Sequence, residues 1–462
     1  MPETKSLHAD DIEVERFMRV PPDFSIWGDS PETTNGRLPS PSAASRCTSE
    51  TTTALAGERA VAERPPSTLG DLLHPVGRDG FAAEYWERQP LVLHRGDPGF
   101  YEGLLSLADM DHILVNSSLG QSELCLMREG KEFPLPPRVD NHPLSPATAQ
   151  ELVYDAYRRG ATIKLSRLHE RWAPLGRLCR VLAAELGARV QTNIYLTPAA
   201  ARGLKEHYDT HDVFVAQIHG TKHWRLYGAP FALPLAGQKH HRRADGLGEP
   251  VREFDLAPGD LLYLPRGWIH DATSQKEASL HLTIGVFVPD WAGLLQAAVA
   301  EITSEGEMFR ASPPLAATEP DLTMIAGRLT VELAARLSPE RLARDALAAR
   351  RREYRPALEG HLLDLEDLGT ISLRTALRRR TDTHVAITVN EAGVRLAFHG
   401  KAIRLPEHVA GDLRFAATGR DFTGQDLPGR LDDAGRMVLL STLLREGFLT
   451  ITDRRSRAGA KI

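Results

Sequence analysis

The chain has 462 residues, too many for one ordinary hydrophobic core, so we expect two or three domains. Charged residues make up 25% and hydrophobic residues 42%, as in ordinary globular proteins, and the net charge of -5 does not support a dedicated nucleic-acid binder. Three cysteines at wide spacings argue against a disulfide scaffold and predict a reducing, cytoplasmic setting. We also expect neither a membrane span nor secretion, because the sequence has no long apolar run and no leader-like apolar stretch.

The first 66 residues differ in composition from the remainder. Residues 31–66 are dense in Ser, Thr, Pro, Ala and Glu and show no sustained hydrophobic period. Such a segment cannot bury enough apolar surface to offset its ordering entropy. We therefore expect residues 1–66 to form a disordered N-terminal extension.

From residue 67 the pattern changes to helices and then to short strands. Residues 176–187 have the apolar spacing of an amphipathic helix that ends at a C-cap glycine. Strand candidates alternate apolar and polar residues or form short apolar runs, and turn residues bound them. Six or more such strands predict a jelly roll, whose two sheets can enclose a site. The candidates are residues 192–197, 213–218, 223–227, 254–256, 261–264 and 280–288.

Two histidines and an aspartate in this region have the composition of a metal site. His207 and Asp209 are two positions apart, so at a strand end both side chains would point to one face, and His270 lies beyond the next strands. Two imidazoles and one carboxylate form the facial triad that holds non-heme Fe(II) and leaves three positions open. In a chain with 18 histidines a His-x-Asp pair also arises by chance, and the alternative is a solvated loop.

Other polar residues near this pair have ordinary interpretations. His211, His219 and His223 each fit a polar edge or turn, because only alternate strand positions face one site. Asp212 is expected to accept a hydrogen bond from a metal-bound imidazole rather than to bind the metal. For His281 two interpretations stay open, a buried structural imidazole and a residue that touches the site.

After Pro289 the sequence becomes rich in Ala and Leu. Residues 291–303 and 322–337 indicate two helices joined by a segment that contains Pro and Ser. Their apolar stripes need burial but do not identify the partner. Packing within the same subunit and packing against a second copy both stay open.

Beyond residue 346 a further unit is expected. Residues 372–380 and 431–446 indicate helices, and residues 385–398 alternate with period two around a turn, which predicts a hairpin. Arginine runs in this part could contact nucleic acid, but charge runs are usually solvated faces. The runs comprise Arg350, Arg351, Arg352, Arg378, Arg379, Arg380, Arg454, Arg455 and Arg457.

Several motifs together resemble a known family. They are YWERQPL at 85–91, NIYLTP at 193–198, HYD at 207–209, GTKHWRLY at 220–227, PGDLLYLPRGWIH at 258–270 and SLHLT at 279–283. From about residue 67 to the C-terminus, the chain resembles the Jumonji C (JmjC) cupin-like oxygenases of the ribosomal oxygenase type. These enzymes use Fe(II), 2-oxoglutarate and O2 to hydroxylate protein side chains.

The resemblance implies roles for individual residues. His207, Asp209 and His270 correspond to the iron ligands, which are the catalytic centre. Lys222 corresponds to the basic residue that binds the distal carboxylate of 2-oxoglutarate, and such pairing neutralises two charges that would each be costly to bury alone. Some bacterial relatives carry Arg at that position. The family lines the co-substrate pocket at three further positions, which here are Asn193, Tyr195 and Thr283.

The implied architecture is α+β. It has a JmjC/cupin-like double-stranded β-helix with flanking helices at residues 67–290, a helical dimerisation segment at 291–345 and a winged-helix-like domain at 346–462. The implied substrate is a protein or peptide, such as an arginine or histidine of a ribosomal protein, and the implied assembly is a homodimer. Alternatives are a hydroxylase of small molecules or peptide natural products, a metal-dependent cupin of another activity, which would not need Lys222, and a non-catalytic adaptor.

Overall fold

The computed structural model describes residues 5–16, 65–117, 123–136, 138–139, 142–239, 247–352, 358–380, 385–390, 392–399 and 401–453. Contacts divide these residues into two compact units, one formed by residues 65–352 and the other by residues 5–16 together with 358–453. Residues 17–64, for which disorder was expected, lie outside the described residues. No helix in the described part of the chain is long and apolar enough to cross a bilayer.

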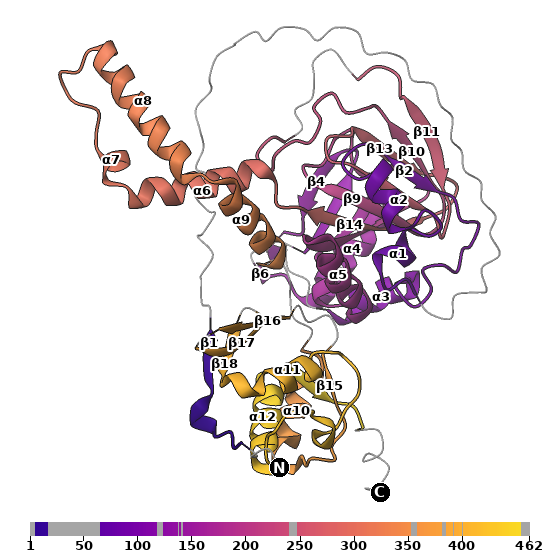
Figure 1. Cartoon of the computed structure of the whole chain (residues 1–462). Helices are drawn as coiled ribbons and strands as arrows, with labels where there is room; N and C mark the ends of the chain where they lie inside the picture. The colour runs from indigo at the N-terminus through magenta and orange to yellow at the C-terminus, as the bar shows by residue number, and fades with distance from the viewer. Residues whose placement is uncertain are drawn as a thin grey trace, which may run out of the picture. The chain divides into compact units, whose positions relative to one another are not determined.

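The first unit is built on two antiparallel sheets (Figure 1). The larger has the order β2-β12-β9-β14-β8-β7-β3-β4 and the smaller has the order β11-β10-β13. A separate two-stranded ribbon pairs β5 (Arg138–Val139) with β6 (His142–Pro143). The strands of the two main sheets are β2 (Leu91–Leu93), β3 (Leu124–Arg128), β4 (Lys131–Pro134), β7 (Thr162–Ser166), β8 (Arg189–Thr197), β9 (Asp212–His219), β10 (Lys222–Leu226), β11 (Arg252–Leu256), β12 (Leu261–Leu264), β13 (His270–Ser274) and β14 (Ser279–Phe287).

The surroundings of strand β9 explain why its sequence is almost continuously apolar. Phe214 belongs to the core between the larger sheet and the helices, whereas Val213 and Val215 belong to a second core with Trp224 and Leu226 of the smaller sheet. A strand that is covered on both faces has no solvent side and loses the polar alternation. The predicted jelly-roll fold of antiparallel sheets with flanking helices is confirmed.

Helices that precede and interrupt the strands pack on the outer face of the larger sheet. Their ends follow local capping chemistry, since Thr68 and Ser106 accept backbone N–H groups at helix starts and Gly187, with φ of 61°, ends the helix predicted over 176–187. They are α1 (Leu69–Leu72), α2 (Gly77–Glu84), α3 (Leu107–Asn116), α4 (Pro146–Arg158) and α5 (Ala173–Leu186).

A helical segment follows the last strand of this unit. It contains α6 (Trp291–Glu305), α7 (Glu307–Arg310), α8 (Glu319–Arg336) and α9 (Pro339–Arg352). The two helices predicted here are confirmed as α6 and α8. Helix α8 buries none of its residues and lies apart from the strands of its own unit (Figure 1).

The second unit joins both ends of the chain. Its sheet has the order β1-β18-β17-β16, and Leu7 lies in its hydrophobic core. The expected disorder is therefore wrong for residues 5–16. Leu7 buries its side chain in the core, and β1 pairs with the edge of β18. Local composition cannot reveal such long-range contacts. The strands are β1 (Glu13–Arg16), β16 (Ala386–Asn390), β17 (Gly393–Phe398) and β18 (Lys401–Leu405).

The remaining part of this unit contains the regions predicted as a hairpin and as two helices. Strands β16 and β17 form the predicted hairpin, and α12 matches the predicted helix over 431–446. The prediction of a helix over 372–380 is wrong. The Thr375 hydroxyl accepts a hydrogen bond from the backbone N–H of Ser372 (2.9 Å) and closes a turn. The chain then continues as a strand that pairs with β19. The elements are α10 (His361–Asp367), β15 (Leu377–Arg379), α11 (Ala410–Ala416), α12 (Asp433–Arg445) and β19 (Leu449–Ile451).

Candidate metal centre and co-substrate pocket

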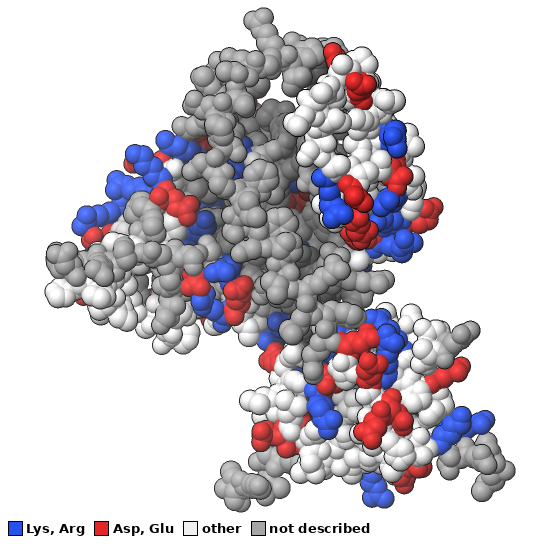
Figure 2. All heavy atoms as spheres, turned by 90° about the vertical axis from the view of Figure 1, so that its left-hand side faces the viewer, with Lys and Arg blue, Asp and Glu red and all other residues white. Residues whose placement is uncertain are grey.

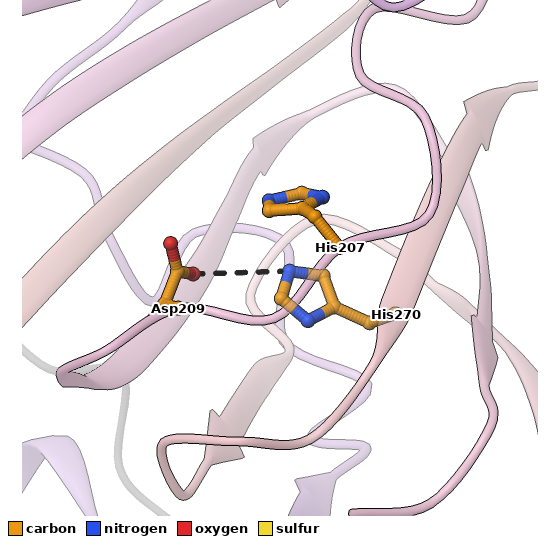
Figure 3. Close-up of side chains that lie close together, drawn as sticks. All are labelled: His207, Asp209 and His270. Carbon is orange, nitrogen blue, oxygen red and sulfur yellow. Dashed lines mark ion pairs between the residues drawn. The ribbon is translucent and has the colours of Figure 1, made fainter. Parts of the chain in front are cut away.

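The three residues of the expected triad come together at the start of β13 (Figure 3). His207 forms an isolated antiparallel bridge with His270, with backbone hydrogen bonds of 3.1 and 2.9 Å. Asp209 follows, and its carbonyl accepts from the backbone N–H of Gly267 (3.0 Å). One ligand atom from each side chain lies within 4.8 Å of the others, and no other such His, Cys, Asp or Glu group occurs in the described ranges. The pair precedes β9, so the bridge to His270, and not strand alternation, aligns it.

Each histidine presents its Nε2 atom for a metal. The Nδ1–H of His207 donates to the Lys205 carbonyl (2.8 Å), and the Nδ1–H of His270 donates to the Trp268 carbonyl (2.9 Å). A carbonyl only accepts, so these bonds select the tautomer whose Nε2 carries a lone pair. Such bonds also fix the orientation of the rings.

The surroundings of His270 and Asp209 favour the deprotonated forms of these two side chains. Burial, reinforced by the nearby His207, lowers the pKa of His270 to about 4. Burial alone would raise the pKa of Asp209, but the neighbouring His207, His211 and His270 outweigh it and lower the pKa. Metal binding requires neutral imidazoles and an ionised carboxylate. The pKa shifts of His270 and Asp209 are in the direction that this condition requires.

Lys222 is a buried ammonium with no carboxylate partner among the described residues. It begins β10 and is 4% exposed, with its Nζ atom 3.0 Å from Thr197 Oγ1 and 3.3 Å from His281 Nδ1. Burial lowers the pKa of Lys222 to about 7. A carboxylate that entered here would stabilise the charged form. His281, for which two interpretations were open, is a buried imidazole whose ring contacts this lysine.

Two aromatic rings pack against His281, the histidine that contacts this lysine. Tyr195 stacks on His281 with 4.9 Å between ring centroids, and Trp224 meets the same ring edge-on at 5.8 Å and lies 5.9 Å from His270. The buried indole N–H of Trp224 has no hydrogen-bond partner in the described part of the chain. Sequence reasoning did not select Trp224, although its place two positions after Lys222 puts both side chains on one face of β10.

Asn193 and Thr283 are direct neighbours across β8 and β14. Two positions along each strand lie Tyr195 and His281, so all four side chains share one face of the larger sheet. The Asn193 side-chain carbonyl accepts from the backbone N–H of Arg167 (3.2 Å), a residue with φ of 55°. Asn193 therefore also holds a strained turn at the edge of this face.

Asp212 binds an arginine and not an imidazole. It is fully buried and accepts from the backbone N–H (2.9 Å) and guanidinium (3.0 Å) of Arg266, which also pairs with Glu87 (2.5 Å). The expectation that Asp212 orients a metal-bound imidazole is wrong, because backbone carbonyls already occupy the Nδ1 atoms of both histidines. Asp212 instead anchors the loop that leads to His270.

His211 and His223, which were both expected at a polar edge or turn, lie in different surroundings. His223 pairs with Asp255 (2.7 Å) and Glu253 (3.0 Å), away from the face that carries Lys222. His211 stacks on Phe287 at 4.3 Å and is close enough to the triad to influence the pKa of Asp209. His223 is thus a polar surface residue, and His211 borders the metal centre.

The residues present fit a metal with a carboxylate-bearing co-substrate. Two imidazoles and a carboxylate suit Fe(II), and the absence of a fourth ligand in the described cluster leaves positions for a chelating molecule. Among the described residues, the buried Lys222 has no carboxylate partner and the buried Trp224 N–H has no hydrogen-bond acceptor. Both groups could therefore donate to a bound molecule. Both lie on the strand that pairs with β13, the strand of His270.

Comparisons with known proteins match this part of the chain. Residues 167–294 match the family model of the JmjC domain. Ribosomal oxygenase 1 of Gallus gallus is 34% identical over 256 residues, which cover 53% of this chain and 41% of that protein. Ribosomal oxygenase 2 of Mus musculus is 34% identical over 232 residues, which cover 49% of this chain and 48% of that protein. The chain thus spans about half the length of the curated relatives it matches.

A solved structure is similar over a longer stretch. It is YcfD, a ribosomal oxygenase from Escherichia coli in complex with cobalt and 2-oxoglutarate, at 17% identity and a TM-score of 0.46, covering 80% of this chain and 97% of that one. The matched JmjC domain contains all three triad residues and Lys222. The chain thus matches the JmjC domain over residues 167–294 and is similar to ribosomal oxygenases over about half of its length.

Proposed function

We propose that this protein is an Fe(II)- and 2-oxoglutarate-dependent oxygenase that hydroxylates an amino-acid side chain of a protein. The observation that carries the proposal is a buried lysine that has no carboxylate partner among the described residues and lies on the strand next to a two-histidine, one-aspartate cluster. A metal-dependent cupin of another activity would require the cluster but not this lysine. The names of the curated relatives support the same activity.

Each residue has a defined task in this proposal. His207, Asp209 and His270 hold Fe(II) through two Nε2 atoms and a carboxylate oxygen, which leaves coordination positions open. Lys222 binds the distal carboxylate of 2-oxoglutarate, with Thr197 and His281 orienting its ammonium group. When bound, the iron and its co-substrate supply the oxidising chemistry with O2, and the protein aims one C–H bond of the substrate at the metal.

We propose that the residues beside Lys222 exclude water from this chemistry. His281 contacts Lys222 and packs against both Tyr195 and Trp224, and Asn193 and Thr283 continue the face of the sheet that carries Tyr195 and His281. Low water content strengthens the attraction between the ammonium group and a bound carboxylate. We assign Asn193, Tyr195 and Thr283 to the co-substrate pocket on this basis.

The substrate class follows from the relatives. Both are named ribosomal oxygenases, so we infer a ribosomal protein as the substrate. The resemblance stated above implies arginine or histidine as the modified residue. Other proteins, peptide natural products and small molecules are the alternatives. Mass spectrometry of proteins from cells with and without this protein would identify a substrate by the gain of one oxygen atom.

A direct assay tests the activity class. Succinate release by the purified protein should require both Fe(II) and 2-oxoglutarate. Metal-dependent turnover without 2-oxoglutarate would indicate another cupin activity. Absence of turnover with every candidate substrate, together with absence of 2-oxoglutarate binding, would indicate an adaptor.

Binding of 2-oxoglutarate is expected to weaken as pH rises above about 7. The pKa of Lys222 is lowered to about 7, so the ammonium form that pairs with the carboxylate is lost as pH increases through this value. The Kd should be nearly constant below pH 7 and rise up to about tenfold per pH unit above it. Calorimetry with Mn(II)-loaded protein between pH 6 and 9 measures this. Lys222→Arg should remove the pH dependence, because arginine stays charged throughout.

The helical segment supports a homodimer. On α8, Met324 and Val331 are 63% and 70% exposed and are seven positions apart, so they lie on one stripe of the helix. Trp291 at the start of α6 is 63% exposed. Identical apolar stripes of two copies can cover each other by C2 pairing, the commonest symmetry of homo-oligomers.

The double substitution Met324→Glu and Val331→Glu is expected to produce a monomer without loss of folding, since both side chains are exposed within one subunit. Light scattering at micromolar concentration measures the mass. Thr330→Glu, on an exposed position of the same helix, is the matched control and should stay dimeric. A wild-type monomer, or a double variant that stays dimeric, would contradict this interface.

The C-terminal unit is proposed to be winged-helix-like, without a nucleic-acid role. Arg378 pairs with Asp421 (2.5 Å), and the buried Arg380 pairs with Asp364. Basic and acidic side chains are interspersed over the described residues in Figure 2. The side chains of Arg351 and Arg352, and all of Arg454, Arg455 and Arg457, lie outside the described part. We place the protein in the cytoplasm, a setting that suits the free thiols of Cys125 and Cys179.

A further inference from the structure

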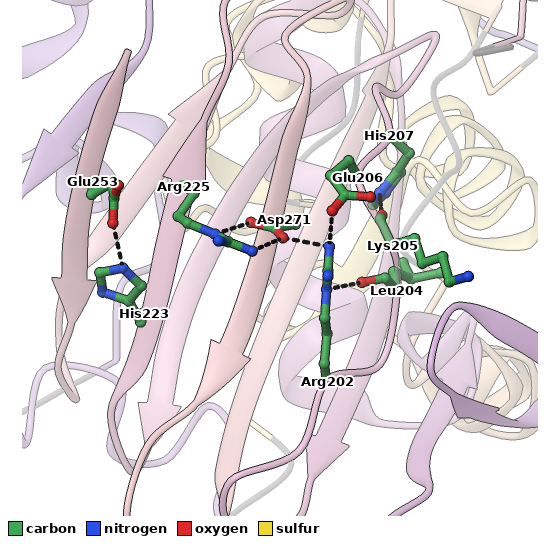
Figure 4. A network of polar contacts seen from close by, with 9 residues as sticks. All are labelled: Arg202, Leu204, Lys205, Glu206, His207, His223, Arg225, Glu253 and Asp271. Carbon is green, nitrogen blue, oxygen red and sulfur yellow. Dashed lines mark hydrogen bonds and ion pairs between the residues drawn. The ribbon is translucent and has the colours of Figure 1, made fainter. Parts of the chain in front are cut away.

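One arginine ties the segment that carries His207 to the strand that carries His270 (Figure 4). The Nη2 group of Arg202 contacts the Asp271 carboxylate and Glu206 Oε1 (2.6 Å). Its Nε–H donates to the Leu204 carbonyl (3.2 Å). Asp271 directly follows His270, and Glu206 directly precedes His207. The guanidinium therefore contacts a chain neighbour of each histidine.

The carboxylate at the centre of this network is completely buried. The Asp271 side chain is 0% exposed and is covered by the guanidinium groups of Arg202 and Arg225. Side chains alternate along β13, so Asp271 lies on the face opposite His270 and takes no part in the pocket itself. A buried charge is stable only with its partners in place, so this carboxylate holds Arg202 firmly.

Because Asp271 holds Arg202 in place, the short segment from Arg202 to His207 is also restrained. Arg202 also forms a β-bridge with Thr273, and the carbonyl of Lys205 accepts the Nδ1–H of His207. A shift of the segment would move both the backbone of His207 and the hydrogen bond that orients its ring. The two histidines would then no longer face one metal ion at the required distances.

We propose that Arg202 is a positioning residue of the metal centre, which holds His207 and His270 at the spacing that one metal ion requires. This inference rests on the proposed function, since it assumes that the triad binds a metal. Arg225 provides a matched control. It binds the same carboxylate (2.9 and 2.5 Å), but from strand β10, and in the described structure its guanidinium makes no hydrogen bond to the His207 segment.

The test compares metal affinity with stability in full-length protein. Wild type, Arg202→Gln and Arg225→Gln are titrated with Mn(II), with the free ion measured by electron paramagnetic resonance, and the thermal midpoint of each metal-free protein is recorded. Both variants should have similarly lowered midpoints, because each loses one partner of Asp271. Arg202→Gln should raise the Mn(II) Kd by about tenfold or more, and Arg225→Gln by less than about twofold. Equal Kd values for the two variants would overturn the proposal.

A conservative variant covers the case in which Arg202→Gln does not fold. Arg202→Lys keeps a charge against Asp271 but cannot reach Asp271, Glu206 and the Leu204 carbonyl together. It should fold, raise the Mn(II) Kd severalfold and alter the Co(II) visible absorption spectrum relative to Arg225→Lys. An unchanged Kd and spectrum would refute the positioning role alone. A wild-type protein that binds no Mn(II) would instead refute the proposed metal site.

Discussion

Replacement of His207 or Asp209 by alanine should abolish Fe(II)-dependent succinate formation while the protein stays folded. Each residue supplies one of only three ligand atoms in the cluster. Mutation of a group that hydrogen-bonds to a metal ligand typically lowers metal affinity or activity by about 10- to 100-fold. Loss of a ligand itself should therefore lower the rate by more than about a hundredfold. Coupled measurement of succinate at saturating 2-oxoglutarate gives the rate.

Stability should change little in these variants, because apolar strands form the core and both side chains lie at its edge, partly exposed. The thermal midpoint of the metal-free protein tests this. His223→Ala is the matched control, since His223 is a histidine on β10 that pairs with surface carboxylates outside the pocket. Its rate should stay near the wild-type value. Full turnover in either triad variant would show that the assignment of the metal ligands is wrong.

Replacement of Lys222 by alanine should raise the Kd for 2-oxoglutarate by about 30-fold or more. Truncation of one partner of a buried, hydrogen-bonded charge pair costs about 2–5 kcal/mol, and about 1.4 kcal/mol corresponds to tenfold. Lys222 is 4% exposed, so water cannot replace it effectively. Calorimetric titration of Mn(II)-loaded protein with 2-oxoglutarate measures the change.

The metal affinity supplies the internal control for Lys222→Ala. Lys222 contacts Thr197 and His281 but none of the triad, so the Mn(II) Kd should stay within about twofold of wild type. Lys222→Arg should be milder, because it retains the positive charge. An unchanged 2-oxoglutarate Kd in Lys222→Ala would assign this lysine a purely structural role.

Local sequence patterns were sufficient for six strands of the first unit, for the hairpin of the second unit and for helices α5, α6, α8 and α12. Alternation and turn residues located β8 to β12 and β14, because burial of one or both sheet faces dictates which positions are apolar. The His-x-Asp pair and the later His270 identified a metal-capable set from residue chemistry alone. Resemblance to the JmjC oxygenases, and not periodicity, directed attention to Lys222.

Local patterns failed where a partner lies far away in the chain. Composition predicted disorder for the whole N-terminal region, yet Leu7 and β1 are ordered by contacts with a unit near the other end of the chain. The helix expected at 372–380 became strand β15 because β19 offers it hydrogen bonds. Propensity is a weak determinant of structure when tertiary pairing competes with it.

By itself the sequence determined which residues could bind a metal and where several strands of the jelly roll run, since both depend on residue type and short-range spacing. The tertiary structure alone decided what each polar group contacts. It directed Asp212 to Arg266, brought His281 and Trp224 against the pocket of Lys222, and linked Arg202 through Asp271 to the neighbours of two metal ligands. Such contacts join residues tens of positions apart, and only the folded chain brings them within hydrogen-bonding distance.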